Sequence, residues 1–216
     1  MSNEKTRYVQ YGCGPFSNPN GWENFDTSPT LRLQRLPIIG KLTIGYAPVV
    51  FSENIKYGDI LKGLPNVDSE SCDAVFCSHV LEHLTLADCK IAISNTYKIL
   101  KKDGVFRCIV PDLEAYALQY LKALKSDATE ANHIFLGRLM LHQKNKVKSV
   151  RDFMIQSLGN AGHKYMWDKY SLKKELTEAG FSSVRLCKYN DSAIRAFESV
   201  ENIERFSDAI AFEAIK

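Results

Sequence analysis

The stretch YVQYGCGPFSNPNGWENFD, residues 8–26, decides the fold prediction. It begins as a short strand, continues into a turn with Gly12 and Gly14, and ends as a second strand that closes on Asp26. A strand, a Gly-x-Gly turn and a second strand ending in an acid are typical of a nucleotide-binding α/β unit. In such units an acid about 20 residues beyond the glycines binds the ribose.

The helix that normally follows the glycine turn has no room here. Pro15, Pro19 and the Asn20-Gly21 pair crowd the segment, and Asp26 follows Gly12 by only 14 positions. A pyrophosphate needs the N-terminus of that helix. The sequence therefore favours a nucleoside ligand without a diphosphate, such as S-adenosylmethionine. The other interpretation is an ordinary tight turn and an ordinary strand-end acid.

The rest of the chain alternates strand and helix patterns. Residues 29–56 look irregular, whereas near-continuous apolar runs at 73–78 and 105–110 predict strands buried on both faces of a parallel sheet. Further strands are expected at 55–60, 183–189 and 208–216, and helices from Thr85 to Gly104, over 113–124 and from Ser171 to Gly180. This order predicts one α/β domain over residues 1–216.

Three segments beyond the glycine turn carry a resemblance to a known family. They are KYGDI, DAVFCSHVLEHL and ILKKDGVFRCIVPDL, and HKYMWDKYSLKKELTEAGF adds a second match. In this order the chain resembles the class I S-adenosylmethionine-dependent methyltransferases, in the small-molecule subgroup with the VLEHL signature. The glycine turn with its missing helix resembles a branch associated with bacterial surface-polysaccharide biosynthesis. The resemblance covers roughly residues 6–112.

The resemblance implies a Rossmann-like, mostly parallel sheet with an antiparallel last strand and S-adenosylmethionine as cofactor. It also assigns roles to residues of this chain. Gly12, Cys13 and Gly14 would line the methionine end, Asp26 would hold the ribose, Asp59 and Ile60 would contact the adenine, and Ser78 and His79 would lie beside the sulfonium.

A hydroxyl acceptor must lose a proton, and histidine is the usual base near neutral pH. The candidates are His79, His83 and His163, together with Asp112 at the predicted carboxyl edge of the sheet. For Asp112 the alternative is a helix N-cap. For His83 the alternative is an ordinary helix histidine.

His79 to His83 also spells His-x-x-Glu-His, the pattern of inverted zinc peptidases. His79 is expected to precede the helix, and no third ligand stands out downstream. We therefore predict no metal ligands, and Glu82 is interpreted either as a local cap or pairing group or as a residue that takes part directly in catalysis.

The acceptor is predicted to be small and polar, a saccharide or a phosphorylated sugar precursor. Residues 113–160 are expected to form a helical cover over the site. The basic run 144–151 either meets a phosphorylated sugar or is a solvated helix face. Tyr165 and Trp167 pack either against a sugar ring or, more commonly, against the core.

Composition limits the remaining possibilities. A net charge of +3 does not suggest a nucleic-acid binder, and neither a membrane span nor a secretory h-region stands out. Six scattered cysteines without Cys-x-x-Cys spacing fit reduced thiols in a cytoplasmic protein. The alternative to an enzyme is a non-catalytic cofactor-binding partner of one. The oligomeric state is not predicted.

Overall fold

The computed structural model describes residues 6–15, 21–37, 40, 49–126, 128–141 and 162–216. Its centre is a seven-stranded sheet with the order β3-β2-β1-β4-β5-β7-β6. The strands are β1 (Tyr8–Tyr11), β2 (Trp22–Asp26), β3 (Ile55–Tyr57), β4 (Cys72–Ser78), β5 (Leu100–Pro111), β6 (Ser183–Leu186) and β7 (Ala209–Ile215). Strands β1 to β5 pair in parallel, and β7 pairs antiparallel with both β5 and β6. The predicted sheet is confirmed.

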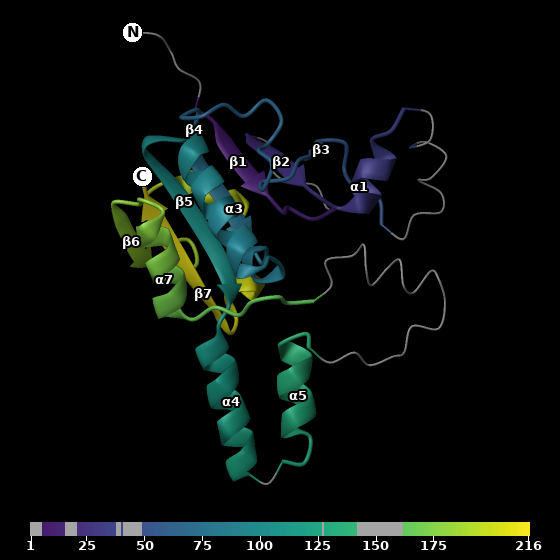
Figure 1. The fold of residues 1–216 in the computed structure, drawn as a ribbon, viewed down its shortest axis with the longest axis vertical. Helices are drawn as coiled ribbons and strands as arrows, with labels where there is room; N and C mark the ends of the chain where they lie inside the picture. Colours follow the sequence, from purple (N-terminus) through teal and green to yellow (C-terminus); the bar gives the residue numbers. More distant parts are fainter. Residues whose placement is uncertain (1–5, 16–20, 38–39, 41–48, 127, 142–161) are drawn as a thin grey trace.

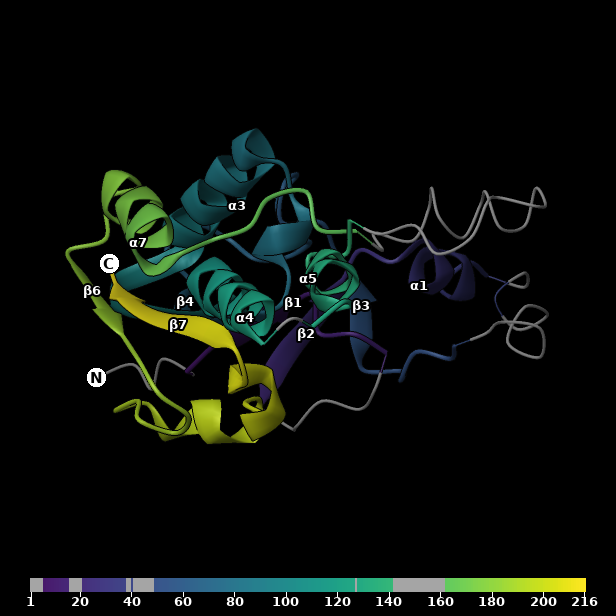
Figure 2. The same ribbon diagram turned by 90° about the horizontal axis from the view of Figure 1, so that it is seen from below.

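Helices cover the two faces of this sheet unequally. The α-helices are α1 (Pro29–Gln34), α3 (Leu86–Ile99), α4 (Leu113–Lys125), α5 (Ala131–Arg138) and α7 (Lys169–Glu178). Short 3-10 helices are η1 (Leu81–His83), η2 (Arg195–Ser199) and η3 (Ile203–Phe206). Figures 1 and 2 show α3 and α7 side by side on one face, with η2 and η3 on the other.

Each face of the sheet has its own apolar core. The larger one lies under α3 and α7 and includes Phe106, Leu172 and Leu176. The smaller one packs Trp22, Phe76 and Phe197 against each other on the side of η2. The central strands β4 and β5 are therefore buried on both faces, as the sequence predicted for 73–78 and 105–110.

The loop between β1 and β2 contains no helix among its described residues. Gly12 and Gly14 take left-handed conformations with φ of +65° and +75°, which suit glycine. Residues 16–20 of this loop lie outside the described part of the chain. For the loop as a whole, the missing first helix stays a prediction.

Two boundaries differ from the prediction. Residues 29–34 form α1 rather than an irregular segment, with Pro29 in its first turn. Gly104 lies within β5 and does not end α3, because α3 stops at Ile99 and β5 begins at Leu100. The pairing of β5 with β4 shifts register between Cys72 and Ala74. The polar residues 101–104, which the sequence pattern predicted to be a turn, are therefore an irregularity within β5.

Helix α4 differs from its prediction in burial. The apolar stripe expected over 113–124 is present, but none of its residues is buried, and Leu118, Leu121 and Leu124 are exposed. Figure 1 shows α4 and α5 as a hairpin that extends from the carboxyl end of β5, and Tyr120 stacks on Phe135 between them. That this segment covers the site stays a prediction.

Helix α7 is capped by Asp168, not by Ser171 as predicted. The Asp168 carboxylate accepts from the backbone N–H groups of Tyr170 and Ser171, while the Ser171 hydroxyl is the partner of the Asp168 N–H. The two residues thus form a reciprocal capping box. Gly180, with φ of +106°, follows the helix as predicted.

Removing this cap is expected to destabilise the fold. Asp168→Ala should lower the free energy of unfolding by about 0.5–2 kcal/mol at neutral pH, the usual cost of losing an N-cap. Urea unfolding measures the loss. The matched control is Glu130→Ala, because Glu130 occupies the N-cap position of α5 without a side-chain bond. Equal losses in the two variants would contradict the assignment.

The effect of Asp168 should also depend on pH. The N–H of Ser171 holds the pKa of this carboxyl below its usual value. A carboxyl with a depressed folded-state pKa stabilises the fold above its unfolded pKa of about 3.9, and that contribution is lost as the pH falls through the folded value. The difference between wild type and Asp168→Ala should therefore shrink in acid.

Candidate functional site at the carboxyl edge of the sheet

The glycine turn after β1 meets the segment after β4 at the carboxyl edge of the sheet. A Cβ atom built on Gly12 would lie 2.3 Å from Val80 Cγ2, so the backbone of the turn touches this side chain directly. Val80 stands between His79 and Leu81 in the sequence. The predicted methionine end of the cofactor site and the histidine segment are therefore adjacent, at the edge where α/β proteins bind ligands.

Asp26 holds the glycine turn in place. Its carboxylate accepts from the N–H of Gly14 at 3.0 Å and from the N–H of Ser28 at 2.8 Å. A carboxylate has about four lone-pair sites, so these two bonds leave acceptor capacity for another donor. The space beside Gly14 is open, since no heavy atom lies within 4 Å of a Cβ built there.

Asp59 and Ile60 follow β3 in the turn that the resemblance assigned to adenine. Asp59 Oδ1 accepts from the N–H of Leu61 at 3.0 Å, and Lys62 Nζ lies 3.6 Å from Oδ2. Ile60 is buried in the larger core, and its carbonyl accepts from Asn95. Their contacts with an adenine ring stay predictions.

Ser78 and His79 end β4 with unusual geometry. Ser78 Oγ is shielded from solvent and has no hydrogen-bond partner among the described residues. His79 has a φ of +56°, and its N–H donates to the carbonyl of Ile109 on β5. Its ring Nε2 donates to the carbonyl of Arg205 at 3.0 Å, because a carbonyl can only accept.

The segment from Gly162 to Trp167 lies against η1. The carbonyl of Glu82 accepts from the backbone N–H groups of Lys164 and Tyr165, and His83 Nδ1 donates to the carbonyl of Gly162. These bonds bring His163 to within a ring-centroid distance of 5.1 Å of His83. Burial lowers the pKa of His163 and so favours its neutral form.

Glu82 is the residue whose role the sequence interpretation missed. It is 0% exposed, and both carboxylate oxygens lack a hydrogen-bond donor among the described residues. His79 Nδ1 lies 3.4 Å and His83 Nε2 lies 3.9 Å from Oε1. The three histidines therefore gather around this buried carboxylate. The His-x-x-Glu-His pattern was the signal for it, although not through a helix face.

Comparisons with known proteins give this site its context. A family model described as a methyltransferase domain matches residues 47–108, which include β3, β4, α3 and most of β5. The fold, with its antiparallel β7 in an otherwise parallel core, is Rossmann-like. The match to the family model indicates that this part of the chain belongs to a methyltransferase domain.

Solved structures resemble this methyltransferase in fold at low sequence identity. A structure of PigF with SAH has a TM-score of 0.50 at 12% identity, covering 100% of this chain and 52% of that one. A possible histamine N-methyltransferase of Thermotoga maritima has a TM-score of 0.49 at 16% identity, over 97% of this chain and 82% of that one. A methyltransferase of Archaeoglobus fulgidus scores 0.48 at 16% identity, covering 99% and 87%. None of the curated proteins compared with the chain matches it.

S-adenosylmethionine is the cofactor that the match to a methyltransferase domain indicates. The residues present fit it on two observations. Ser78 Oγ is a shielded polar atom without a partner among the described residues, at the tip of a central strand. The space beside Gly14 would be lost to any larger side chain. Gly12, Cys13, Gly14, Asp26 and Ser78, the predicted set, lie at or just after the carboxyl ends of β1, β2 and β4.

Asp112, Tyr165 and Trp167 are the remaining candidates for the site. Asp112 caps α4 by accepting from the N–H of Glu114 at 2.9 Å, which agrees with its N-cap interpretation, and burial raises the pKa of this carboxyl. Trp167 is fully buried and belongs to the larger core, whereas Tyr165 packs against that core while partly exposed. Trp167 therefore has no exposed ring face for a sugar.

The zinc-peptidase interpretation fails on local geometry. That motif needs both histidines on one α-helix. Here His79 has a positive φ and precedes η1, and α3 begins only after Thr85, which caps it by accepting from the N–H of Asp88. Residues 79–83 of the methyltransferase therefore do not form an α-helix.

The cysteines are unpaired. Cys72, Cys77, Cys89 and Cys108 are buried, and Cys13 and Cys187 are partly so. Burial raises the pKa of Cys13 to about 12, so its thiol stays protonated beside the glycine turn. Among the described residues, no helix combines the length and apolar character that a membrane crossing requires.

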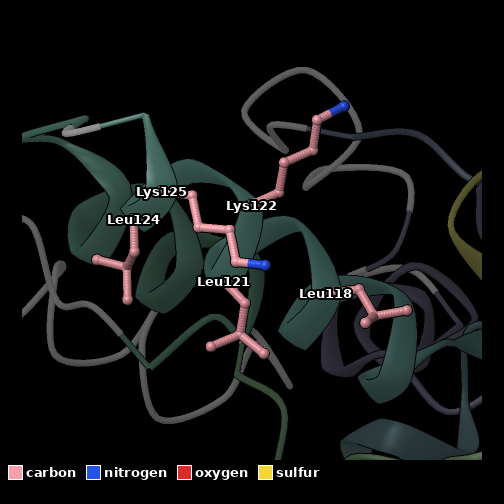
Figure 3. A pocket seen from close by; sticks show the side chains of 5 residues that line it. All are labelled: Leu118, Leu121, Lys122, Leu124 and Lys125. Atoms are coloured by element: carbon pink, nitrogen blue, oxygen red, sulfur yellow. The ribbon is translucent and has the colours of Figure 1, made fainter.

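A shallow hollow on α4 lies apart from the predicted site residues. Leu118, Leu121, Lys122, Leu124 and Lys125 line it, as Figure 3 shows. His133 is exposed on α5. His142 and the basic run 144–151 lie outside the described residues.

Proposed function

We propose that this methyltransferase transfers a methyl group to a hydroxyl of a small, polar acceptor, a saccharide or an activated sugar precursor in polysaccharide biosynthesis. One observation supports an oxygen acceptor most directly. The contact of Gly12 with Val80 brings the cofactor turn next to a group of histidines and one carboxylate. Such groups bind and orient a hydroxyl and can take up its proton.

The roles of the cofactor residues follow from this proposal. The N–H groups of the Gly12–Gly14 turn would bind the carboxylate of the methionine part, and Asp26 would accept from the ribose hydroxyls. Asp59 would accept from the adenine amino group, with Ile60 beneath the ring. Ser78 Oγ and the backbone of His79 would lie beside the sulfur. When bound, S-adenosylmethionine supplies a methyl carbon that its sulfonium already activates.

The chain mainly has to align the acceptor with that carbon. Well-oriented reactants gain on the order of 7–11 kcal/mol over free encounter. Of the four base candidates, His83 and His163 face Glu82, and Asp112 is engaged in the cap of α4. His79 has one ring nitrogen bonded to Arg205 and the other turned toward Glu82. The base is thus sought among the three histidines.

The test is the chemical identity of the product. The purified full chain, given S-adenosylmethionine labelled in its methyl group and a panel of sugars, sugar phosphates and nucleotide-linked sugars, should label one of these compounds on oxygen. Mass spectrometry locates the methyl group. A product methylated on nitrogen or carbon would contradict the proposed acceptor. Retention of adenosylhomocysteine without any product from metabolite extracts would favour the non-catalytic partner instead.

A further inference from the structure

Glu82, His83 and His163, called here the Glu82 cluster, form a compact group of ligand atoms. One atom from each side chain lies within 4.8 Å of the other two. Glu82 is fully buried, yet neither of its carboxylate oxygens receives a hydrogen bond from the described residues. Burying an ionised carboxylate without a counter-charge is strongly unfavourable. The site therefore calls for a bound cation or a proton.

The hydrogen bond of His83 fixes which nitrogen faces the cluster. Nδ1 lies 3.2 Å from the carbonyl of Gly162, which only accepts, so the proton is on Nδ1. In the neutral ring Nε2 then carries a lone pair, 3.9 Å from Glu82 Oε1. A histidine that donates one N–H to a backbone carbonyl and turns its other nitrogen inward is the usual arrangement of a metal ligand.

The other two histidines add to the same pattern. His163 Nδ1 is shielded and has no partner among the described residues. His79 donates Nε2–H to the carbonyl of Arg205, so its Nδ1 faces Glu82 Oε1 at 3.4 Å and holds a lone pair when the ring is neutral. Lone pairs that face one another at this distance repel unless a cation lies between or beside them.

We propose that the Glu82 cluster binds one divalent transition-metal ion, with zinc the best match. Two neutral imidazoles and one carboxylate form a recognised zinc donor set that leaves a position open, whereas magnesium and calcium prefer oxygen ligands alone. Tetrahedral zinc bonds place ligand atoms about 3.4 Å apart, so the side chains need only move inward slightly. This assignment departs from the sequence prediction of no metal ligands.

The location suggests what the open position would hold. Val80 separates His79 from η1 and touches the Gly12 turn, so the cluster lies next to the predicted methionine end of the cofactor. This role, unlike the site, rests on the proposed methyl transfer. An acceptor oxygen would fill the open position and be held beside the methyl donor.

The test measures metal binding without any activity. The full chain is stripped with a chelator and titrated with Co²⁺, whose visible absorption reports on nitrogen and carboxylate ligands, and Zn²⁺ is then titrated by calorimetry. One Co²⁺ per chain is expected, displaced by Zn²⁺. Glu82→Gln, which keeps the size of the side chain, should weaken binding roughly 100-fold or more, because even the loss of a residue that only hydrogen-bonds a metal ligand costs about 10–100-fold.

Two further variants make the result decisive. His163→Gln changes a residue in a loop outside the helices and should weaken metal binding as much as Glu82→Gln does. The site can therefore still be tested if the Glu82 variant fails to fold. His133→Gln, an exposed histidine on α5, should leave binding unchanged. No Co²⁺ absorption in folded protein, or unchanged binding in both cluster variants, would overturn the site.

The same samples separate this site from the proposed function. Adenosylhomocysteine binding is measured by calorimetry with and without Zn²⁺. A chain that binds Zn²⁺ at the cluster and ignores adenosylhomocysteine supports the metal site and contradicts methyl transfer. A chain that binds adenosylhomocysteine and ignores both metals overturns the metal site alone.

Discussion

Replacement of Arg107 by methionine is expected to lower the free energy of unfolding by about 3–5 kcal/mol, the usual cost of breaking a buried ion pair on one side. The Arg107 side chain is 0% exposed within β5. Its Nε donates to Glu201, its Nη1 to Asp191 at 2.9 Å and to Glu213 at 3.1 Å. Without the guanidinium, the fully buried carboxylate of Glu201 loses its counter-charge.

The control for Arg107 is its neighbour Arg185 on β6. Arg185 binds two of the same partners, Asp191 and Glu213, but its side chain is 42% exposed. Arg185→Met should therefore cost no more than about 1 kcal/mol in urea unfolding. Replacing Glu201 by methionine in the Arg107→Met chain should recover part of the loss. Equal losses for the two single arginine variants would contradict burial as the cause.

Gly12→Ala is expected to reduce the affinity for adenosylhomocysteine about 100-fold or more. Alanine at a φ of +65° costs roughly 1–2 kcal/mol. Its Cβ would also lie 2.3 Å from Val80 Cγ2, which no packing tolerates, so the turn must shift. A displaced turn no longer presents its N–H groups where the methionine carboxylate binds. Calorimetry with adenosylhomocysteine measures the change.

Two variants isolate the clash from the backbone strain. Gly21 also has a positive φ, of +98°, but no heavy atom lies within 4 Å of a Cβ built there. Gly21→Ala should therefore strain the backbone without displacing the glycine turn, and the affinity for adenosylhomocysteine should change little. Val80→Ala in the Gly12→Ala chain removes the clashing methyl group and should restore part of the affinity. No recovery in the double variant would speak against the contact as the cause.

The sequence located the fold well because its signals are local. The alternation of apolar runs, the Thr85 cap and the glycine turn each depend on residues a few positions apart, and the strands and α3 follow from them. The predicted boundaries of secondary-structure elements were wrong where contacts with other residues set them. Asp168 caps α7 through a capping box that shifts the helix start by three residues from the predicted Ser171 cap. Residues 101–104 lie within β5 because Leu100 and Val105, on either side of them, pair with Cys72 and Ala74 of β4.

Site residues divide in the same way. Gly12, Gly14 and Asp26 were predictable because they belong to one short loop whose composition excludes a helix. Glu82 was not, because its environment is made by histidines from both sides of η1. His83 reaches Gly162, 79 positions away in the chain, and the bonds of Lys164 and Tyr165 to Glu82 bring His163 with them.

The sequence by itself therefore determined a parallel α/β sheet and predicted a connection from β1 to β2 that is too short for a helix. Both follow from signals that act over a few residues, namely apolar periodicity and the prolines and glycines of that connection. Only the tertiary structure decided that Arg107 and Glu82 are buried ionisable groups, one surrounded by carboxylates and one by imidazoles. Burial and counter-charge depend on which distant segments pack together, and no local pattern encodes that.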